Sequence, residues 1–141
     1  MIKQVCSGGL LVKHNRFLFG KRSKNKLWAP GVWDIVGGKA LKNEHPLYTL
    51  KREIYEETKV VVLNAELITS LNIYDESISE DFTYHIYMVT HWKNKAVNNS
   101  KEHSKLRWFK RKRLDNLQLA LPEYLKLIDR WLILNQSLNK S

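Results

Sequence analysis

Three carboxylates lie within five residues of this chain, at spacings that a helix would bring to one side. Glu53 and Glu57 stand four residues apart, with Glu56 between them. Like charges at this spacing destabilise a helix by about 0.2–0.5 kcal/mol. Only Glu56 has basic residues at helical spacing, Arg52 before it and Lys59 after it. A hard divalent cation such as Mg2+, which prefers oxygen ligands, would relieve the repulsion.

The surrounding residues predict the helix that carries these carboxylates. Pro46 suits the first position of a helix, where its missing N–H is not needed. Residues suited to burial then recur at three- and four-residue steps: Leu47, Leu50, Ile54 and Thr58. A solvated acidic surface would show the same charge pattern, so the helix alone leaves both interpretations open.

The segment before this helix favours a ligand site. Residues 33–36 are predicted as a short strand ending in Gly37 and Gly38. Two glycines permit a tight turn and a close approach of the backbone to a ligand. Glu44 then precedes the helix, where the helix dipole favours a carboxylate. The combination predicts a site for phosphate and metal.

The run Gly38-x5-Glu44-x7-Arg-Glu-Ile-x-Glu-Glu-x-Lys-Val resembles the signature of the Nudix hydrolases. It departs from that signature at Lys59, where the family usually has glycine. A lysine at a left-handed helix end costs about 1 kcal/mol, or else the helix ends differently. The resemblance implies an α/β fold, a Nudix-type α/β/α sandwich with a mixed β-sheet between helices.

The metal and catalytic residues follow from the carboxylates and from the resemblance. The expected ligands of Mg2+, with Mn2+ as a substitute, are Glu53, Glu56 and Glu57, and the resemblance adds the Gly38 carbonyl. Glu53 or Glu102 is expected as general base, although Glu102 also fits a simple loop position. Arg52 is expected to orient Glu56 through a bidentate pair.

The resemblance also suggests substrate contacts. In Nudix enzymes that clear oxidised purine nucleotides, side chains at the places of Asp34 and Glu123 read the base. The alternatives are that Asp34 caps a turn and that Glu123 sits in the first turn of a helix, where acids are common. Arg22, Trp28 and Tyr74 are further candidates for phosphate or ring contacts.

The predicted reaction is cleavage of the diphosphate linkage of a nucleoside diphosphate-X substrate. A nucleoside triphosphate is favoured, including oxidised purine forms, giving a monophosphate and pyrophosphate. ADP-ribose, dinucleoside polyphosphates and RNA 5′ ends are alternatives. A non-catalytic Nudix domain that senses nucleotides or binds RNA is disfavoured, because all signature carboxylates are present. A prenyl diphosphate isomerase would need a loop cysteine, whereas Cys6 falls in a predicted strand.

Composition is typical of a globular protein, with 43% hydrophobic and 11% aromatic residues. A single domain over residues 1–141 is expected, in the cytoplasm. No apolar run approaches the roughly 18 residues of a membrane span, and one cysteine excludes an internal disulfide. The net charge of +10 predicts a phosphate-rich partner, here a nucleotide. The basic segment 101–113 is interpreted as a solvated loop in preference to a nucleic-acid site.

The remaining elements are predicted from periodicity. A hairpin is expected over 4–12 and 16–22, followed later by strands at 60–63, 65–73, 82–92 and 106–109. The first two of these later strands could form one continuous strand. A C-terminal helix is expected from Pro122, with a buried side of Leu125, Ile128, Trp131 and Leu132. The five histidines show no ligand pair on one helix, which disfavours a zinc site.

Overall fold

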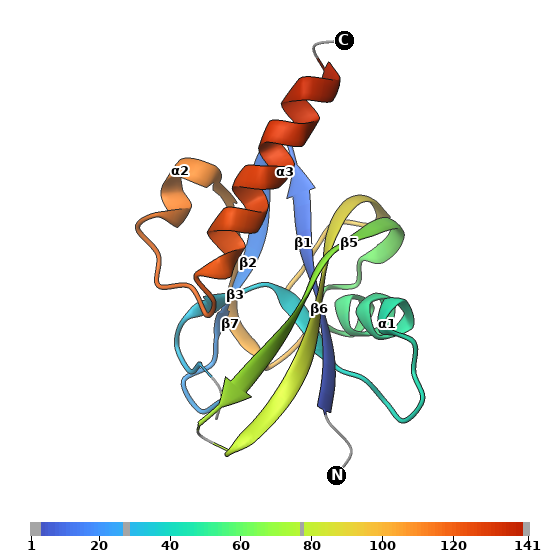
Figure 1. Cartoon of the computed structure of the whole chain (residues 1–141), viewed down its shortest axis with the longest axis vertical. Coiled ribbons are helices and arrows are strands. Elements are labelled where there is room, and N and C mark those ends of the chain that lie inside the picture. Colours follow the sequence, from blue (N-terminus) through green and yellow to red (C-terminus); the bar gives the residue numbers. More distant parts are fainter. Residues whose placement is uncertain (1–3, 27–28, 77, 140–141) are drawn as a thin grey trace.

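The computed structural model describes residues 4–26, 29–76 and 78–139 of the 141-residue chain (Figure 1). In chain order the elements are β1 (Gln4–Lys13), β2 (Arg16–Arg22), β3 (Trp33–Asp34), β4 (Val36–Lys39), α1 (Pro46–Thr58), β5 (Val61–Asp75), β6 (Glu80–Lys93), β7 (His103–Lys110), α2 (Arg111–Leu114) and α3 (Glu123–Asn139). No helix in these ranges is long and apolar enough to cross a membrane.

The strands form a mixed sheet with β1 near its centre. The main order is β3-β2-β1-β6-β5, and β4 also pairs with β1 while β7 pairs with β2. β1 runs parallel to β6 and antiparallel to β2 and β4. Gly37 and Gly38 were predicted to end a strand in a tight turn, but they lie inside β4, where they pair with Gly8 and Ser7 of β1.

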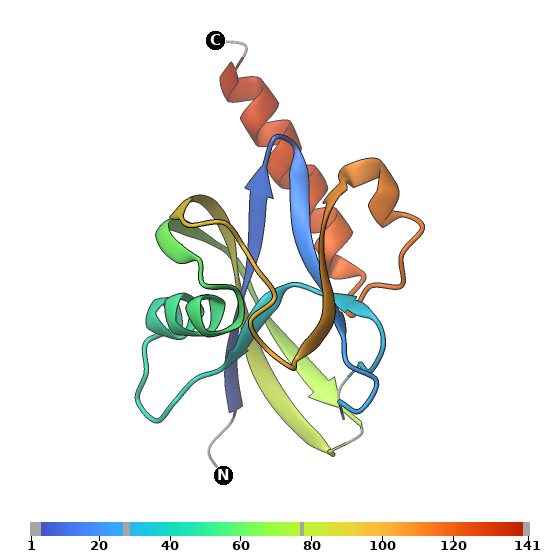
Figure 2. The same cartoon turned by 180° about the vertical axis from the view of Figure 1, so that it is seen from behind.

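Alternating residues of the central strands face two separate cores, because successive strand side chains point to opposite faces. Leu10 of β1 packs in the cluster that contains Tyr124 and Ile128 of α3. Leu11 packs in the cluster that contains Leu50 of α1. The two helices therefore cover opposite faces of the sheet, as Figures 1 and 2 show. This confirms the predicted layering of helices on both sides of a mixed sheet.

Helix α1 has the predicted bounds and buried side. Pro46 is its first residue, Leu50, Ile54 and Thr58 are buried, and Leu47 is partly buried. The helix ends at Lys59, which adopts a left-handed conformation with φ of 65°. The carbonyl of Tyr55 accepts a hydrogen bond from the Lys59 N–H at 2.9 Å. The glycine of the family signature is therefore replaced without a change in the way the helix ends.

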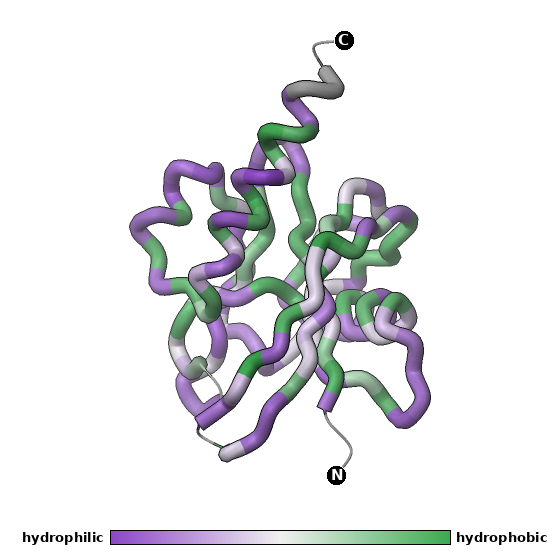
Figure 3. Tube along the Cα trace, in the orientation of Figure 1, coloured by the Kyte–Doolittle hydropathy of each residue, from purple (hydrophilic) through white to green (hydrophobic). Residues whose placement is uncertain are grey.

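β5 is one 15-residue strand, which agrees with the alternative of a continuous strand. Two elements differ from the sequence-based expectation. The expected strand over 33–36 is interrupted at Ile35, whose N–H donates to the Asp34 carboxylate at 2.8 Å instead of to a neighbouring strand. The short helix α2 was not predicted, and it lies in a mainly hydrophilic region (Figure 3). Its four residues are too few to show a helical repeat in sequence.

Candidate active site

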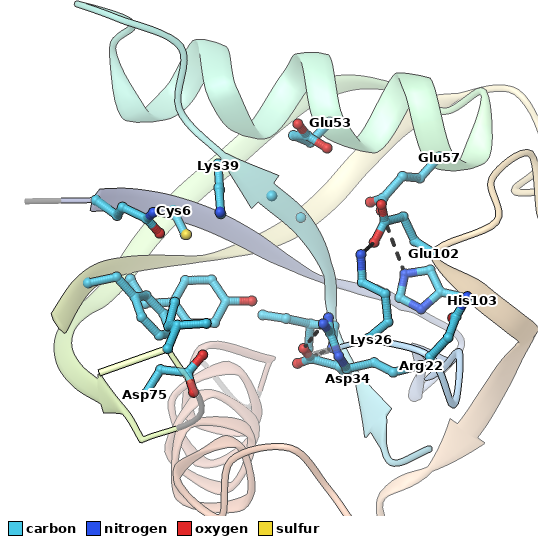
Figure 4. A pocket seen from close by; sticks show the side chains of 18 residues that line it. Cys6, Arg22, Lys26, Asp34, Lys39, Glu53, Glu57, Asp75, Glu102 and His103 are labelled. Carbon is cyan, nitrogen blue, oxygen red and sulfur yellow. Dashed lines mark hydrogen bonds and ion pairs between the residues drawn. The ribbon is translucent and has the colours of Figure 1, made fainter. Parts of the chain in front are cut away.

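A cavity of about 550 Å3 lies between α1, β4 and the start of β7 (Figure 4). The described residues that line it include Cys6, Arg22, Lys26, Asp34, Gly37, Gly38, Lys39, Glu53, Glu57, Tyr84, Glu102 and His103. The fold thus brings together seven predicted site residues from across the sequence: Arg22, Asp34, Gly38, Glu53, Glu57 and Glu102 on the cavity wall, and Arg52 in contact with Glu53. Glu56 and Glu123 are not among the described lining residues.

Arg52 is the centre of a hydrogen-bond network, but its main partner is not the predicted one. Its Nε and Nη2 atoms donate to the two carboxylate oxygens of Glu44 at 2.9 and 3.0 Å. Nη2 also donates to the Lys39 carbonyl at 2.9 Å. The bidentate pair expected with Glu56 therefore forms with Glu44, because the loop before α1 folds back over the guanidinium.

Glu53 and Glu56 share the remaining donor of Arg52. The Nη1 atom lies 2.8 Å from Glu53 Oε1 and 3.3 Å from Glu56 Oε2. The Glu56 side chain is 56% exposed, which fits a weak surface contact. Lys59, the other expected partner of Glu56, lies over the Tyr55 ring at 5.2 Å from its centroid.

Glu53 lies against Gly38 of β4. A Cβ atom added at Gly38 would fall 2.4 Å from the carboxyl carbon of Glu53, so only glycine allows this approach. Burial raises the pKa of Glu53, and the hydrogen bond and charge of Arg52 oppose that rise. The carboxylate is thus held at the cavity wall by one cation and one glycine.

Glu57 is the least satisfied carboxylate of the site. Its side chain is 6% exposed, and its Oε2 atom has no hydrogen-bond partner among the described residues. Burial raises the pKa of this carboxyl to about 9, and the charges of Glu53 and Glu102 add to the rise. A backbone hydrogen bond from Gly37 opposes this rise, but a buried carboxylate oxygen without a partner is still costly, which indicates that the site is built for an additional ligand.

His103 faces Glu57 across the cavity and was missed by the sequence analysis. Its Nε2 atom lies 3.8 Å from Glu57 Oε1, and both ring nitrogens lack a hydrogen-bond partner in the described structure. Burial lowers the pKa of His103 to about 4, so the ring is neutral at pH 7. Gly20 makes room for it, since a Cβ there would lie 2.4 Å from Nδ1. No local spacing in the sequence marks this long-range contact.

Glu102 lies beside Glu57 and His103 and forms an ion pair with Lys26 (Figure 4). Partial burial would raise the pKa of Glu102, but the hydrogen bond and charge of Lys26 outweigh it and lower the pKa. Lys26, Lys39 and Arg22 add positive charge to the same cavity. Such a wall suits a substrate with several phosphates.

Asp34 lies at the far side of the cavity in a buried hydrogen-bond network. Its Oδ1 atom accepts from the Tyr124 hydroxyl and from the Ile35 N–H. Its Oδ2 atom faces Arg22 Nη1 at 3.6 Å. Tyr84 in turn is hydrogen-bonded to Tyr124. Burial raises the pKa of Asp34 to about 6, against the opposing effects of Tyr124 and Arg22.

The other predicted contacts are placed differently. Glu123 opens α3, as the helix-start alternative had it, and the buried residue beside Asp34 is its neighbour Tyr124. Tyr74 is 58% exposed at the end of β5. Trp28 lies outside the described residues. Cys6 is half-buried on the cavity wall, where burial raises the pKa of its thiol to about 11.

Comparison with known proteins identifies the family. The sequence profile of the NUDIX domain matches residues 4–131. The chain belongs to the NUDIX family. A protein of Buchnera aphidicola subsp. Schizaphis graminum named 8-oxo-dGTP diphosphatase is 29% identical over 100 residues, which is 71% of this chain and 72% of that protein. A Proteus vulgaris protein of the same name is 30% identical over 98 residues, covering 66% of this chain and 80% of its own length.

A solved structure agrees with this assignment. The mutator MutT protein from Bacillus halodurans superposes with a TM-score of 0.69 at 29% identity, over 88% of this chain and 79% of its own. The predicted family, fold class and assignment as a Nudix pyrophosphohydrolase are thus confirmed.

Nudix hydrolases generally use a divalent metal ion, and the residues around Glu57 fit one. An oxygen-only set of carboxylates, with one buried oxygen unpartnered, suits a hard cation. The described residues contain no group of three or more acidic, histidine or cysteine side chains already converged on one point. Arg52 holds Glu53 and Glu56 instead, which neutralises part of their charge.

Proposed function

We propose that this Nudix hydrolase cleaves nucleoside triphosphates to a monophosphate and pyrophosphate, with oxidised purine nucleotides as preferred substrates. The observation that carries the proposal is the cavity that joins two different polar sites. Glu53 and Glu57 lie at one side of it, and Asp34, held by Tyr124, lies at the other. The first site suits phosphates and a metal ion, and the second suits the base. Both curated relatives are named 8-oxo-dGTP diphosphatase, which supports this choice.

The metal in this proposal is Mg2+, held by Glu53, Glu56, Glu57 and the Gly38 carbonyl, with Mn2+ as a substitute. A bound divalent ion supplies charge neutralisation on the phosphates and lowers the pKa of an attacking water. Within the chain, Glu53 would accept the proton of the attacking water, with Glu102 as the alternative base. Arg52 keeps Glu53 at the cavity wall, while Lys26, Lys39 and Arg22 attract the polyphosphate.

Asp34 provides the base selectivity in this proposal. Oδ1 is occupied by two protein donors, so Oδ2, which faces Arg22 Nη1 at 3.6 Å, is the atom proposed to meet a ligand. An ionised Oδ2 accepts a hydrogen bond from a purine N–H, and a protonated one donates to a ring nitrogen or carbonyl. A mismatched base would leave this buried group unpaired, which is the physical origin of discrimination. Because free triphosphates occur in the cytoplasm, we expect the enzyme to act there.

The test is a product assay over a substrate panel. 8-oxo-dGTP, dGTP, ATP, CTP, ADP-ribose and a dinucleoside polyphosphate are each incubated with Mg2+, with Mn2+ and with excess chelator. We expect the highest kcat/KM for 8-oxo-dGTP, equal amounts of monophosphate and pyrophosphate, and no turnover in chelator. A preference for ADP-ribose, or for a pyrimidine triphosphate, would refute the substrate while leaving the diphosphate chemistry in place.

A further inference from the structure

A second polar surface lies at the opposite end of β1 from the active-site cavity. Gln4, the first residue of β1, lines the cavity, whereas Lys13, the last, lines a groove of about 560 Å3. A ten-residue strand extends roughly 30 Å at about 3.3 Å per residue. The groove is therefore separate from the catalytic residues, and a nucleotide bound in the cavity would not fill it.

This surface, called here the Trp108 groove, is strongly basic. The described residues that line it are Lys13, His14, Arg16, Trp108 and Lys110. None of them is acidic. They come from three neighbouring strands, β1, β2 and β7, together with the hairpin turn. Segments almost one hundred residues apart in sequence thus contribute to one surface.

Three of these cations are in direct register across the sheet. Lys13 pairs with Arg16, and Arg16 pairs with Lys110. Like charges directly opposite in a sheet are destabilising. In the described part of the chain, none of the three forms an ion pair with a carboxylate. The sheet therefore carries uncompensated positive charge here, which an anionic ligand would offset.

The hairpin turn keeps these charges together. His14 and Asn15 both adopt left-handed conformations, with φ of 52° and 59°. Consecutive residues of this kind form the tight two-residue turn that matches the twist of a hairpin. Lys13 and Arg16 flank this turn directly, so they cannot separate without opening the first strand pair.

Trp108 adds an aromatic surface to the same groove. It is half-buried and stacks on Trp92, with ring centroids 5.9 Å apart and an interplanar angle of 15°. Trp108 and Lys110 are two residues apart on β7, so their side chains lie on one face of the sheet. Cations that track phosphates, next to an aromatic ring on which a base can stack, are the features that bind single-stranded nucleic acid.

We infer that the Trp108 groove binds single-stranded nucleic acid, with Lys13, Arg16 and Lys110 on the phosphates and Trp108 against a base. The net charge of +10 supports this binding through non-specific attraction. The sequence alone favoured a solvated loop for residues 101–113. The fold changes that interpretation, because the hairpin brings two further cations beside Lys110 and Trp108. The inference does not depend on the proposed hydrolytic substrate.

The test is fluorescence anisotropy with a labelled single-stranded oligonucleotide of ten nucleotides, over a series of salt concentrations. The double variant Arg16→Gln/Lys110→Gln removes two proposed phosphate contacts. We expect its plot of log K against log salt to be less steep by about 1.4, at about 0.7 per contact for single strands. The control Lys126→Gln/Arg130→Gln removes the same two residue types from exposed positions of α3, on the other face of the sheet. We expect it to keep the wild-type slope.

A second pair of variants tests the stacking. Trp108→Leu should weaken binding at least about fivefold, and Trp108→Tyr, which keeps an aromatic face, should restore most of it. Thermal melting of both variants checks that they fold. Equal losses of affinity in the two double variants would overturn the inference, because positive charge anywhere on the surface would then explain the binding. Unchanged binding by a folded Trp108→Leu, with inorganic polyphosphate competing as well as the oligonucleotide, would overturn it in favour of a site for phosphate chains alone.

Discussion

Glu44 precedes α1 and Glu57 lies in its last turn, and both side chains are largely shielded from solvent, yet their surroundings are opposite. Glu44 accepts hydrogen bonds from Arg52, from the Thr49 hydroxyl and from the Leu41 N–H. Its pKa is lowered to about 2, chiefly by the hydrogen bonds from Arg52. Glu57 has one oxygen without a partner, and burial raises its pKa to about 9.

The contrast separates two uses of a carboxylate within one sequence signature. A carboxylate whose oxygens are all occupied by protein donors stabilises the fold and has little capacity left for a ligand. A buried carboxylate with an open oxygen destabilises the fold unless a proton or a cation neutralises its charge. We therefore expect substitutions at Glu44 to act on stability and substitutions at Glu57 to act on catalysis.

The largest expected effect is on catalysis, at Glu57. Glu57→Gln keeps the shape of the side chain but removes the charge that a metal ion needs. We expect kcat/KM to fall at least about a hundredfold, comparable with the loss of a general base. The melting temperature in chelator should be unchanged, because the raised pKa of about 9 leaves the Glu57 carboxyl already uncharged at pH 7 when no metal is bound. The control is Glu66→Gln on the exposed side of β5, which should match the wild type.

The Glu57→Gln variant also tests metal binding directly. Mg2+ should raise the melting temperature of the wild type but not of Glu57→Gln, since a ligand that binds only the folded state stabilises it. Near wild-type turnover of Glu57→Gln with unchanged metal dependence would show that Glu57 does not act in catalysis. The acidic face of α1 would then be merely solvated.

The next effect is on stability, at Glu44. Glu44→Gln replaces charge-assisted hydrogen bonds with weaker ones, and we expect the free energy of unfolding to fall by about 2 kcal/mol. Because the folded pKa is lowered from 4.5 to about 2, the stabilisation from Glu44 is complete above pH 4.5 and is lost as the pH falls through 2. Urea unfolding of both proteins from pH 7 to pH 2 should therefore show converging stabilities. A constant difference over this range would show that the charge of Glu44 is not what stabilises the loop.

Asp34 combines both situations in one carboxyl group, with Oδ1 occupied and Oδ2 facing Arg22. Asp34→Ala should raise KM for the preferred purine nucleotide about tenfold and flatten the preference over pyrimidines, with metal dependence intact. Tyr124→Phe should have the same direction with a smaller effect, because it removes one of the two donors to Oδ1 without removing the carboxyl. Tyr87→Phe, which removes a hydroxyl from the other core, is the matched control. Unchanged base preference in Asp34→Ala would assign Asp34 a structural role only.

The features of the site that could be predicted from sequence are those set by residues close together in the chain. The three- and four-residue steps after Pro46 identify α1, its buried side and its three acidic residues, because a helix fixes the relative positions of near neighbours. The hairpin was predictable because its two strands are also close together in sequence. The left-handed end at Lys59 follows from the family signature, since the backbone there is set by the turn and not by the side chain.

The partners of each carboxylate were not predictable, because they depend on pairing between distant segments. His103 meets Glu57 only because β7 pairs with β2 next to Gly20. Tyr124 reaches Asp34 across ninety residues of sequence. Arg52 has two possible acidic partners within one helical turn, Glu53 and Glu56. Its bidentate pair nevertheless forms with Glu44, because the loop before α1 folds back over the guanidinium. Spacing alone thus locates the charged residues but not which of them stay unpartnered.

The smallest expected effect is on stability, at Lys59, the residue at which α1 ends. Lys59 lies two residues after Glu57 in a left-handed conformation that glycine adopts without strain. We expect Lys59→Gly to stabilise the protein by about 1 kcal/mol, less any contribution from the contact of Lys59 with the Tyr55 ring. Activity should not change, since the position of Glu57 is fixed by the buried Thr58 and by the hydrogen bond from the Asn99 N–H to the Glu57 carbonyl at 2.8 Å. Chemical denaturation and kcat/KM measured on the same preparation decide the point. If Lys59→Gly instead lowers kcat/KM, the backbone at the end of α1 helps to position Glu57. Residues that stabilise the helix would then also affect catalysis.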